Sequence, residues 1–341
     1  MAHNDYHGVP IILTETDSVA LAKLHGKSVL VMGAAGIIGR ALEHILTDFS
    51  LGLGYTVNVT LAAKSPPSKT PEARENISRV YGDVRDQDFI AKLGEYDFVI
   101  LGAGYGQPAE FERDRNSTIL VNTASVIQLS ELAREGILFL STSEIYSGYE
   151  GAVSEENPCL VDTRHPRAAY IYSKLVGEIA TTGFGSSIRA NIARIALAYG
   201  PGFRDSDKRV LYDFVRKGLT LGRIELLDDG AALRTYGFAT DTALDLVNVM
   251  VSGDGRAYNV GGASKLSIAE LAYMVAEETG ATVSLGSFNP GTSAPKEVSL
   301  NLSRINQLRG ARAYIEMAVG VKAIVAWAQN SGLYMENEKR S

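Results

Sequence analysis

Three glycines, Gly33, Gly36 and Gly39, constrain the fold of this chain more than any other feature of its sequence. They follow a short apolar run, 28–32, that is typical of a buried strand. They precede a segment, 37–46, whose apolar residues recur at helical spacing. In such a strand–turn–helix unit, glycines let the backbone approach a pyrophosphate, and the unpaired N–H groups of the helix N-terminus attract it. The spacing G-x-x-G-x-x-G, which differs from the commoner G-x-G-x-x-G, therefore predicts a dinucleotide-binding turn.

Segments typical of strands alternate with segments typical of helices through the first 200 residues. Strands are expected at 28–32, 57–63, 79–84, 96–104, 137–146 and 187–202, and long helices at 118–135 and 167–182. Strands that are apolar on both faces and alternate with helices indicate an α/β protein with a Rossmann-type, doubly wound parallel sheet.

Shorter elements follow residue 200 and predict a smaller C-terminal α/β lobe that binds the substrate. We therefore expect an N-terminal extension (1–26), a dinucleotide-binding domain (27–200) and the substrate lobe (201–335), with some strands and helices exchanged between the two lobes. A short helix, 19–24, is expected in the extension, capped by Thr16, Asp17 or Ser18, and Asp241 is expected to cap a later helix.

The composition is that of an ordinary globular protein: 341 residues, 45% hydrophobic, with a formal net charge of −6. No apolar run reaches the length of a membrane span, and the first residues do not resemble a secretory signal. The single cysteine, Cys159, fits a reducing compartment. We therefore expect a cytoplasmic protein without a membrane or nucleic-acid partner. The histidines show no metal-ligand spacing, so no metal site is expected.

Tyr170 and Lys174 lie four residues apart in the expected helix 167–182, so they share one helix face. A nearby ammonium favours the tyrosinate form, so we expect a lowered pKa for Tyr170. A tyrosine of this kind is a credible general base for a sugar hydroxyl. Thr142 follows at the end of the expected strand 137–146, where α/β enzymes carry reactive groups, and its hydroxyl is expected to bind the same substrate oxygen.

With these residues the chain resembles the extended short-chain dehydrogenase/reductase family, in particular its nucleotide-sugar epimerases, dehydratases and decarboxylases. The resemblance covers roughly residues 27–310. It rests on GAAGIIG (33–39), GDV (82–84), STSEIY (141–146), YIYSK (170–174), AYGPG (198–202), RTYGFATD (234–241) and YNVGG (258–262). An N-terminal extension is similar to that of one branch of the family.

The resemblance implies NAD as the cofactor. NADP stays open as an alternative, because Lys64 at the end of the second strand could attract its additional phosphate. The implied cofactor contacts are Gly33, Gly36, Ile37, Ile38, Gly39, Lys64, Asp83, Val84, Gly102, Ala103, Tyr170 and Lys174. The implied substrate contacts are Ser143, Arg209, Arg234 and Lys296. Arg234 is expected to reach the diphosphate of the substrate, because a planar bidentate cation suits phosphate.

The resemblance makes Thr142, Glu144, Tyr170 and Lys174 the expected catalytic residues. Thr142-Ser143-Glu144 is similar to the motifs of GDP-mannose 4,6-dehydratases and UDP-glucuronate decarboxylases, whereas simple 4-epimerases usually have no acid there. We therefore expect a 4,6-dehydratase or decarboxylase that acts on a nucleotide-diphosphate sugar through a 4-keto intermediate.

Two other functions stay open. One is an epimerase acting at C4 or at C3/C5 on the same scaffold, and the other is a non-catalytic NAD(P)-binding regulatory protein. A homodimer formed by the helices 118–135 and 167–182 is also expected, because these helices resemble those that pair in this family.

Overall fold

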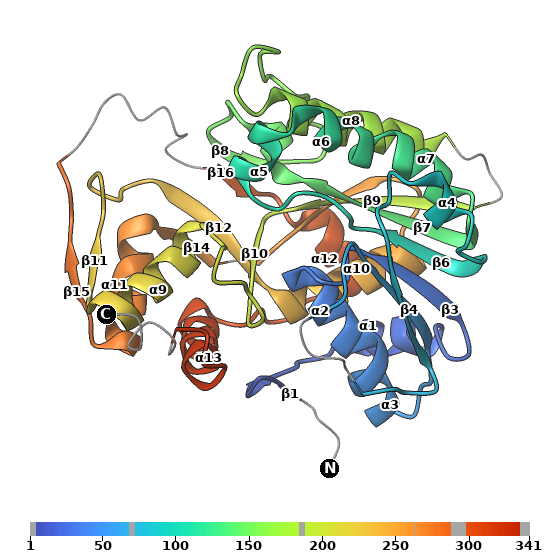
Figure 1. The fold of residues 1–341 in the computed structure, drawn as a ribbon, viewed down its shortest axis with the longest axis horizontal. Helices are drawn as coiled ribbons and strands as arrows, with labels where there is room; N and C mark the ends of the chain where they lie inside the picture. The colour runs from blue at the N-terminus through green and yellow to red at the C-terminus, as the bar shows by residue number, and fades with distance from the viewer. Residues whose placement is uncertain (1–4, 68–71, 184–187, 263, 288–297, 335–341) are drawn as a thin grey trace.

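A seven-stranded parallel sheet forms the centre of the computed structural model, which describes residues 5–67, 72–183, 188–262, 264–287 and 298–334 (Figure 1). The strand order is β13-β9-β7-β6-β3-β4-β5. The strands are β3 (Ser28–Met32), β4 (Asn58–Ala63), β5 (Ile77–Tyr81), β6 (Tyr96–Leu101), β7 (Ala133–Thr142), β9 (Arg189–Ile195) and β13 (Ala257–Val260). The chain runs from β3 outward to β5 and then returns to β6 on the other side of β3. The point where the direction reverses, between β3 and β6, is where such sheets bind their ligands.

Both faces of this sheet are covered, which agrees with the prediction of a Rossmann-type fold. Along β3, Val29 and Val31 belong to the apolar core on one face, and Leu30 and Met32 belong to the core on the other. One face carries α1 (Glu15–Ala22), α2 (Ile37–His44) and α10 (Ala239–Ser252), and the other carries α4 (Gln87–Ile90), α6 (Arg115–Asn122), α7 (Ala124–Ser130) and α8 (Ala168–Thr182) (Figure 1).

A second, smaller group of elements lies to the left of the sheet in Figure 1. It includes a three-stranded sheet of β10 (Leu197–Tyr199), β12 (Leu233–Phe238) and β14 (Ser264–Ser267), the pair β11 (Arg223–Glu225) and β15 (Thr282–Ser284), and the helices α9 (Val210–Leu221), α11 (Ile268–Thr279) and α13 (Met317–Asn330). Although they come late in the chain, β13 pairs with β9 in the central sheet and α10 packs on α2. Among the described residues, no helix is both long and apolar enough to cross a lipid bilayer.

The long helix expected at 118–135 is wrong, because the structure breaks it into three elements. The helices α6 and α7 are separated at Thr123, whose φ of −125° and ψ of −82° lie outside the helical region. The chain then enters β7 at Ala133. The apolar spacing of the sequence continues through Thr123, so the pattern alone does not reveal the break.

Two expected helix caps are also wrong. The helix α1 begins at Glu15, and its cap is Thr14, whose side chain accepts a hydrogen bond from the Asp17 N–H at 3.1 Å. Asp241 lies inside the first turn of α10, and its carboxylate accepts a hydrogen bond from the Ile315 N–H at 2.7 Å. Asp17 still takes part in the cap of α1, because its carboxylate accepts a hydrogen bond from the Thr14 N–H at 2.8 Å, whereas Asp241 contacts a distant part of the chain.

Five buried charged residues, which we call the buried charge cluster, fix the N-terminal extension to the body: Asp17, Asp241, Asp245, Arg309 and Arg312. Arg312 donates to the Asp17 carboxylate at 2.9 Å, to the Asp245 carboxylate at 2.5 Å and to the Asp241 carbonyl oxygen at 2.9 Å. The Nε of Arg309 lies 2.8 Å from the same Asp245 carboxylate. Because these side chains come from α1, from α10 and from the segment before α13, the cluster joins the two ends of the chain.

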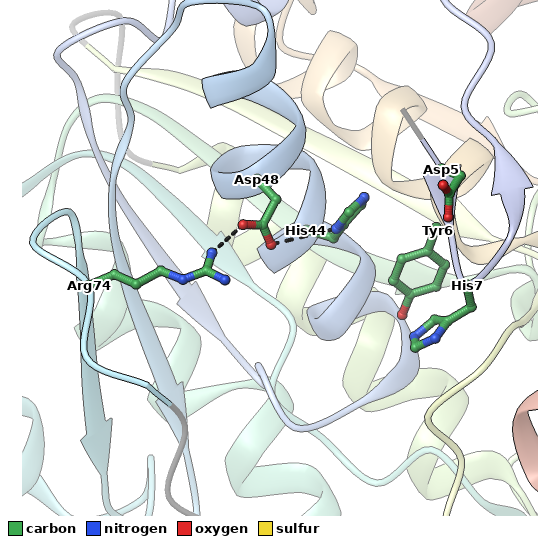
Figure 2. Close-up of a pocket in the computed structure, with 6 residues that line it drawn as sticks. All are labelled: Asp5, Tyr6, His7, His44, Asp48 and Arg74. Atoms are coloured by element: carbon green, nitrogen blue, oxygen red, sulfur yellow. Dashed lines mark hydrogen bonds and ion pairs between the residues drawn. The ribbon is translucent and has the colours of Figure 1, made fainter. Parts of the chain in front are cut away.

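The extension also forms a hairpin of β1 (Asp5–Tyr6) and β2 (Val9–Pro10) that packs against α2 (Figure 2). The ring of Tyr6 lies 5.2 Å from that of His44, the last residue of α2. A pocket of about 310 Å³ opens there and is lined by Asp5, Tyr6, His7, His44, Asp48 and Arg74. This pocket lies at the opposite end of α2 from the glycine turn, so it is separate from the expected cofactor site.

Candidate active site

The glycine turn lies at the switch point of the sheet and has no space for side chains at two of its three positions. Gly33 has a φ of +89°, and a Cβ there would meet the Gly102 carbonyl oxygen at 2.4 Å. A Cβ on Gly39 would meet the Gly33 carbonyl oxygen at 2.5 Å. Gly36 precedes α2, and no side chain caps the helix there. The first N–H groups of α2, at Ile37 and after it, are therefore free of a side-chain cap, as a pyrophosphate site requires.

The residues expected at the adenine end of the cofactor lie close to one another. The Lys64 ammonium at the end of β4 is 3.5 Å from the carboxylate of Asp83, which follows β5. Arg85, which the sequence did not single out, donates two hydrogen bonds to the same carboxylate at 2.9 and 2.6 Å. Hydrogen bonds from Arg85 hold the pKa of Asp83 well below its usual range. Asp83 is therefore an anion held by two cations, and Val84 follows it.

Tyr170 lies in the first turn of α8, with its ring stacked on that of Phe111 at 4.3 Å and 8°. Phe111 comes from α5 (Pro108–Arg113), a short helix after β6. Burial raises the pKa of Tyr170 to about 12, while a hydrogen bond with the buried Thr142 hydroxyl acts in the opposite direction. The structure thus brings together Thr142 and Tyr170, the two hydroxyls that were expected to meet one substrate oxygen.

Lys174 does not lower the pKa of Tyr170 in this structure, so that expectation is not met. The ammonium of Lys174 donates to the Leu140 carbonyl oxygen at 2.7 Å and lies 4.8 Å from the centre of the Phe139 ring. It is therefore directed back toward β7. Burial lowers the pKa of Lys174 to about 8, and the negative charge of Glu178 opposes this shift. Lys174 consequently remains mostly protonated at neutral pH.

Glu144 lies just beyond β7, in the short turn Ser143–Tyr146, and its carboxylate is held by Arg167. One terminal nitrogen of Arg167, Nη1, donates to both carboxylate oxygens at 2.8 and 3.0 Å. The charges of Arg167 and Glu144 also act on Arg234, whose pKa is lowered chiefly by burial. The structure therefore places the expected acid and the expected phosphate-binding arginine in one charged region. Ser143 lies in the same turn.

A buried network lies beside this region and fixes the end of β7. The Glu178 carboxylate accepts hydrogen bonds from Ser141 at 2.5 Å and from Arg194 at 3.0 and 2.8 Å. Arg194 also donates to the Tyr146 hydroxyl at 3.0 Å, and that hydroxyl donates to Asn259 at 2.8 Å. Because Ser141 precedes Thr142 and Tyr146 closes the turn of Glu144, this network fixes the backbone that carries two expected catalytic residues.

The remaining predicted residues have different surroundings. Gly102 and Ala103 follow β6, and the Gly102 N–H donates to the Met32 carbonyl oxygen at 3.1 Å, so they border the glycine turn. Arg209 donates to the Asp207 carboxylate at 2.6 Å and lies over the Tyr212 ring, so its contacts are with residues not predicted to form the site. Ile38 lies in the first turn of α2. Lys296 lies outside the described residues.

Sequence reasoning missed Phe111 and Arg167. A signal for Arg167 exists, because a residue three positions before Tyr170 lies one helical turn away from it. The stacking of Phe111 on Tyr170 has no comparable signal, since the two residues are far apart in sequence and meet only through the fold.

The parallel sheet with a glycine turn at its switch point and a tyrosine–lysine helix beside it defines a dinucleotide-binding α/β enzyme. The model of the NAD dependent epimerase/dehydratase family matches residues 29–261, and the chain belongs to that family. This confirms the predicted family, the extended short-chain dehydrogenase/reductase type of enzyme, and NAD as the cofactor.

Two curated relatives and one solved structure illustrate the likeness. UDP-glucuronic acid decarboxylase 1 of Xenopus tropicalis is 24% identical over 314 residues, covering 89% of this chain and 73% of that protein. A dTDP-4-dehydro-6-deoxy-D-allose reductase of a Streptomyces species is 28% identical over 301 residues, covering 83% and 90%. The structure of DesIV, a dTDP-glucose 4,6-dehydratase from Streptomyces venezuelae with NAD and TYD bound, has a TM-score of 0.77 and 21% identity, covering 89% of this chain and 98% of that one.

Proposed function

We propose that this protein is an NAD-dependent 4,6-dehydratase or decarboxylase of a nucleotide-diphosphate sugar and works through a 4-keto intermediate. The observation that carries the proposal is the placement of Glu144 beside Tyr170. The Thr142 hydroxyl bonds with Tyr170 and also accepts the Glu144 N–H at 3.2 Å, and Arg167 ties the Glu144 carboxylate to the helix of Tyr170. An acid at this position suits chemistry beyond C4, and the relatives include a decarboxylase and a 4,6-dehydratase.

In the first half of the proposed reaction, Tyr170 removes the proton of the C4 hydroxyl while Thr142 holds the same oxygen. The glycine turn would hold NAD, which would supply an acceptor for the C4 hydrogen as hydride and a source of that hydride later in the cycle. Because burial raises the pKa of Tyr170 to about 12, its phenolate needs a nearby cation. Lys174, one turn further along α8 and still protonated at neutral pH, is the cation that we assign to this task. The assignment requires its ammonium to leave the Leu140 carbonyl oxygen and turn toward Tyr170 when cofactor and substrate bind.

In the second half, the 4-keto group acidifies the hydrogen at C5. In a dehydratase, Glu144 removes the C5 proton and passes it to the C6 hydroxyl, which leaves as water. The hydride would then return to C6, and a proton to C5. In a decarboxylase, the bond between C5 and the carboxylate breaks, carbon dioxide leaves, and C5 takes a proton in its place. The hydride would then return to C4. Arg234 would bind the diphosphate in either case, since it lies in the same charged region.

The test is incubation of the purified protein with UDP-, GDP-, CDP- and dTDP-linked hexoses and uronic acids, followed by mass spectrometry. Loss of water or of carbon dioxide supports the proposal, and unchanged mass with inverted stereochemistry selects an epimerase instead. We expect Glu144→Gln to stop the reaction at the 4-keto sugar, whereas Glu150→Gln, an exposed glutamate that follows the same turn, should behave as the wild type. Consumption of no nucleotide sugar would contradict the proposal.

We also propose that the protein is a homodimer that pairs through α6 and α8. Large apolar side chains face outward there: Ile119 and Leu120 on α6, and Val176 and Ile179 on α8, with Ile179 70% exposed. These two helices lie side by side at the edge of the molecule (Figure 1).

Light scattering at micromolar concentration should give twice the mass of the chain. Ile179→Asp should give a monomer. Leu51→Asp, which also replaces an exposed apolar side chain but on the distant helix α3 (Ser50–Gly52), should leave the dimer intact.

A cytoplasmic location stays part of this proposal and is supported by the single cysteine of the chain. The absence of a nucleic-acid partner likewise stays a prediction, from the net charge of −6.

A further inference from the structure

We propose that Arg167 is a positioning residue that holds the Glu144 carboxylate beside Tyr170, and that the second half of the reaction depends on it while the first half does not. The inference rests on the proposed function, in which Tyr170 acts at C4 and Glu144 acts at C5. Arg167 itself is not assigned a contact with the reacting atoms. It acts through Glu144.

The contact between Arg167 and Glu144 joins two separate elements of the site. Arg167 immediately precedes α8, three residues before Tyr170, while Glu144 lies in the turn after β7. The Nη1 of Arg167 donates to both oxygens of the carboxylate, at 2.8 and 3.0 Å. The backbone of Glu144 is fixed separately, because its N–H donates to the Thr142 hydroxyl at 3.2 Å. A single guanidinium therefore determines where the carboxylate lies relative to Tyr170.

Arg167 is held from a second side by α5. Its Nε lies 3.7 Å from the Glu112 carboxylate. The preceding residue of the same helix, Phe111, stacks on the Tyr170 ring. Two neighbouring residues of α5 thus contact the positioning arginine and the proposed base. A lysine could not reproduce this arrangement, because a guanidinium offers several donors in a fixed plane and an ammonium is a single point charge.

The pair is poorly suited to a purely structural role. The side chain of Arg167 is 40% exposed and that of Glu144 is 26% exposed. Ion pairs with this degree of exposure add little to folding stability. By contrast, fixing a charged group relative to its neighbours has a large effect on catalysis, because small displacements of a reacting group slow a reaction strongly. Substitution of Arg167 should therefore affect the reaction and leave the fold intact.

The kinetic test compares Arg167→Ala and Arg167→Lys with the wild type on the nucleotide sugar that the wild type converts. Arg164→Ala is the matched control, because Arg164 lies on the same loop and pairs with Asp162 in an exposed position. We expect Arg167→Ala to lower kcat about 100-fold or more, with KM within about threefold, and to keep forming the 4-keto sugar. It should lose the second half of the reaction, measured as exchange of the C5 hydrogen with deuterated water in a dehydratase or as release of carbon dioxide in a decarboxylase. Arg167→Lys should be intermediate. Guanidinium ion in the buffer should restore part of the kcat of Arg167→Ala.

Wild-type kcat in Arg167→Ala, or an equal loss of 4-keto formation and C5 exchange, would overturn the inference. A second measurement does not require turnover. In crystal structures of the two variants, the Glu144 carboxylate should have left its place beside Tyr170 in Arg167→Ala and kept it in Arg164→Ala. If the wild type converts no sugar, the proposed function fails, and the position of this carboxylate alone decides whether Arg167 holds it. An unmoved carboxylate in Arg167→Ala would then refute the inference.

Discussion

Arg312→Met should destabilise the protein strongly, because it removes one of the two cations of the buried charge cluster. The side chains of Arg312, Asp17 and Asp245 are 0% exposed. Without Arg312, Asp17 loses its guanidinium partner and keeps only neutral donors: Asn248 at 2.6 Å and the N–H and hydroxyl of Thr14 at 2.8 and 2.9 Å. Asp245 keeps Arg309 and the Tyr314 hydroxyl. Three buried carboxylates would then face one guanidinium.

Removal of one partner from a buried ion pair costs about 3–5 kcal/mol. With an unfolding entropy of about 2.1 cal/mol/K per residue, a chain of 341 residues has an unfolding entropy of roughly 0.7 kcal/mol/K. The expected fall in Tm is therefore about 4–7 °C, measured by circular dichroism or calorimetry at pH 7. The control is Arg164→Met, which removes an exposed cation and should shift Tm by less than about 1 °C. Equal Tm changes in the two variants would refute the reasoning from burial.

Three further predictions concern the site and the cluster. Tyr170→Phe should lower kcat by about 10²–10⁴-fold while NAD binding, measured by calorimetry, is retained; full activity would remove Tyr170 as the base. Gly39→Ala should lower both Tm and NAD affinity, because its Cβ would lie 2.5 Å from the Gly33 carbonyl oxygen. In the control variant Gly36→Ala the nearest atom to the Cβ would be 3.4 Å away, so the Tm of the cofactor-free chain should not change. Burial raises the pKa of Asp241 from 3.8 to about 6. Ionisation of Asp241 therefore lowers the free energy of unfolding by about 3 kcal/mol. This loss is absent below pH 4 and complete above pH 6. The free energy of unfolding of Asp241→Asn should therefore increase relative to that of the wild type as pH rises from 4 to 7. A difference between the two proteins that does not change with pH would contradict the raised pKa.

The sequence predicts those parts of the site that depend on local spacing. The glycine turn follows from the positions of Gly33, Gly36 and Gly39, because the backbone conformation and close approach that they allow are properties of a few adjacent residues. The shared helix face of Tyr170 and Lys174 follows from a separation of four residues in the same way.

Contacts between distant segments could not be predicted in this way. The direction of the Lys174 ammonium depends on the Leu140 carbonyl, which the fold brings close to α8. The break at Thr123 is absent from the apolar pattern, which is why one long helix was expected in place of two helices and the start of β7. The stacking of Phe111 on Tyr170 likewise exists only once α5 has packed beside α8.

The buried charge cluster has a consequence for the order in which this protein acquires its structure during synthesis. Asp17 and Arg312 are separated by 295 positions, so the helix that carries Asp17 is made long before the cation that pairs with it. A growing chain that already holds every strand of the central sheet still carries Asp17 and Asp245 without Arg312 and Arg309. Final docking of α1 onto the sheet must therefore wait for residues 309–312, so this dinucleotide-binding unit is completed only after all strands of its central sheet have been made.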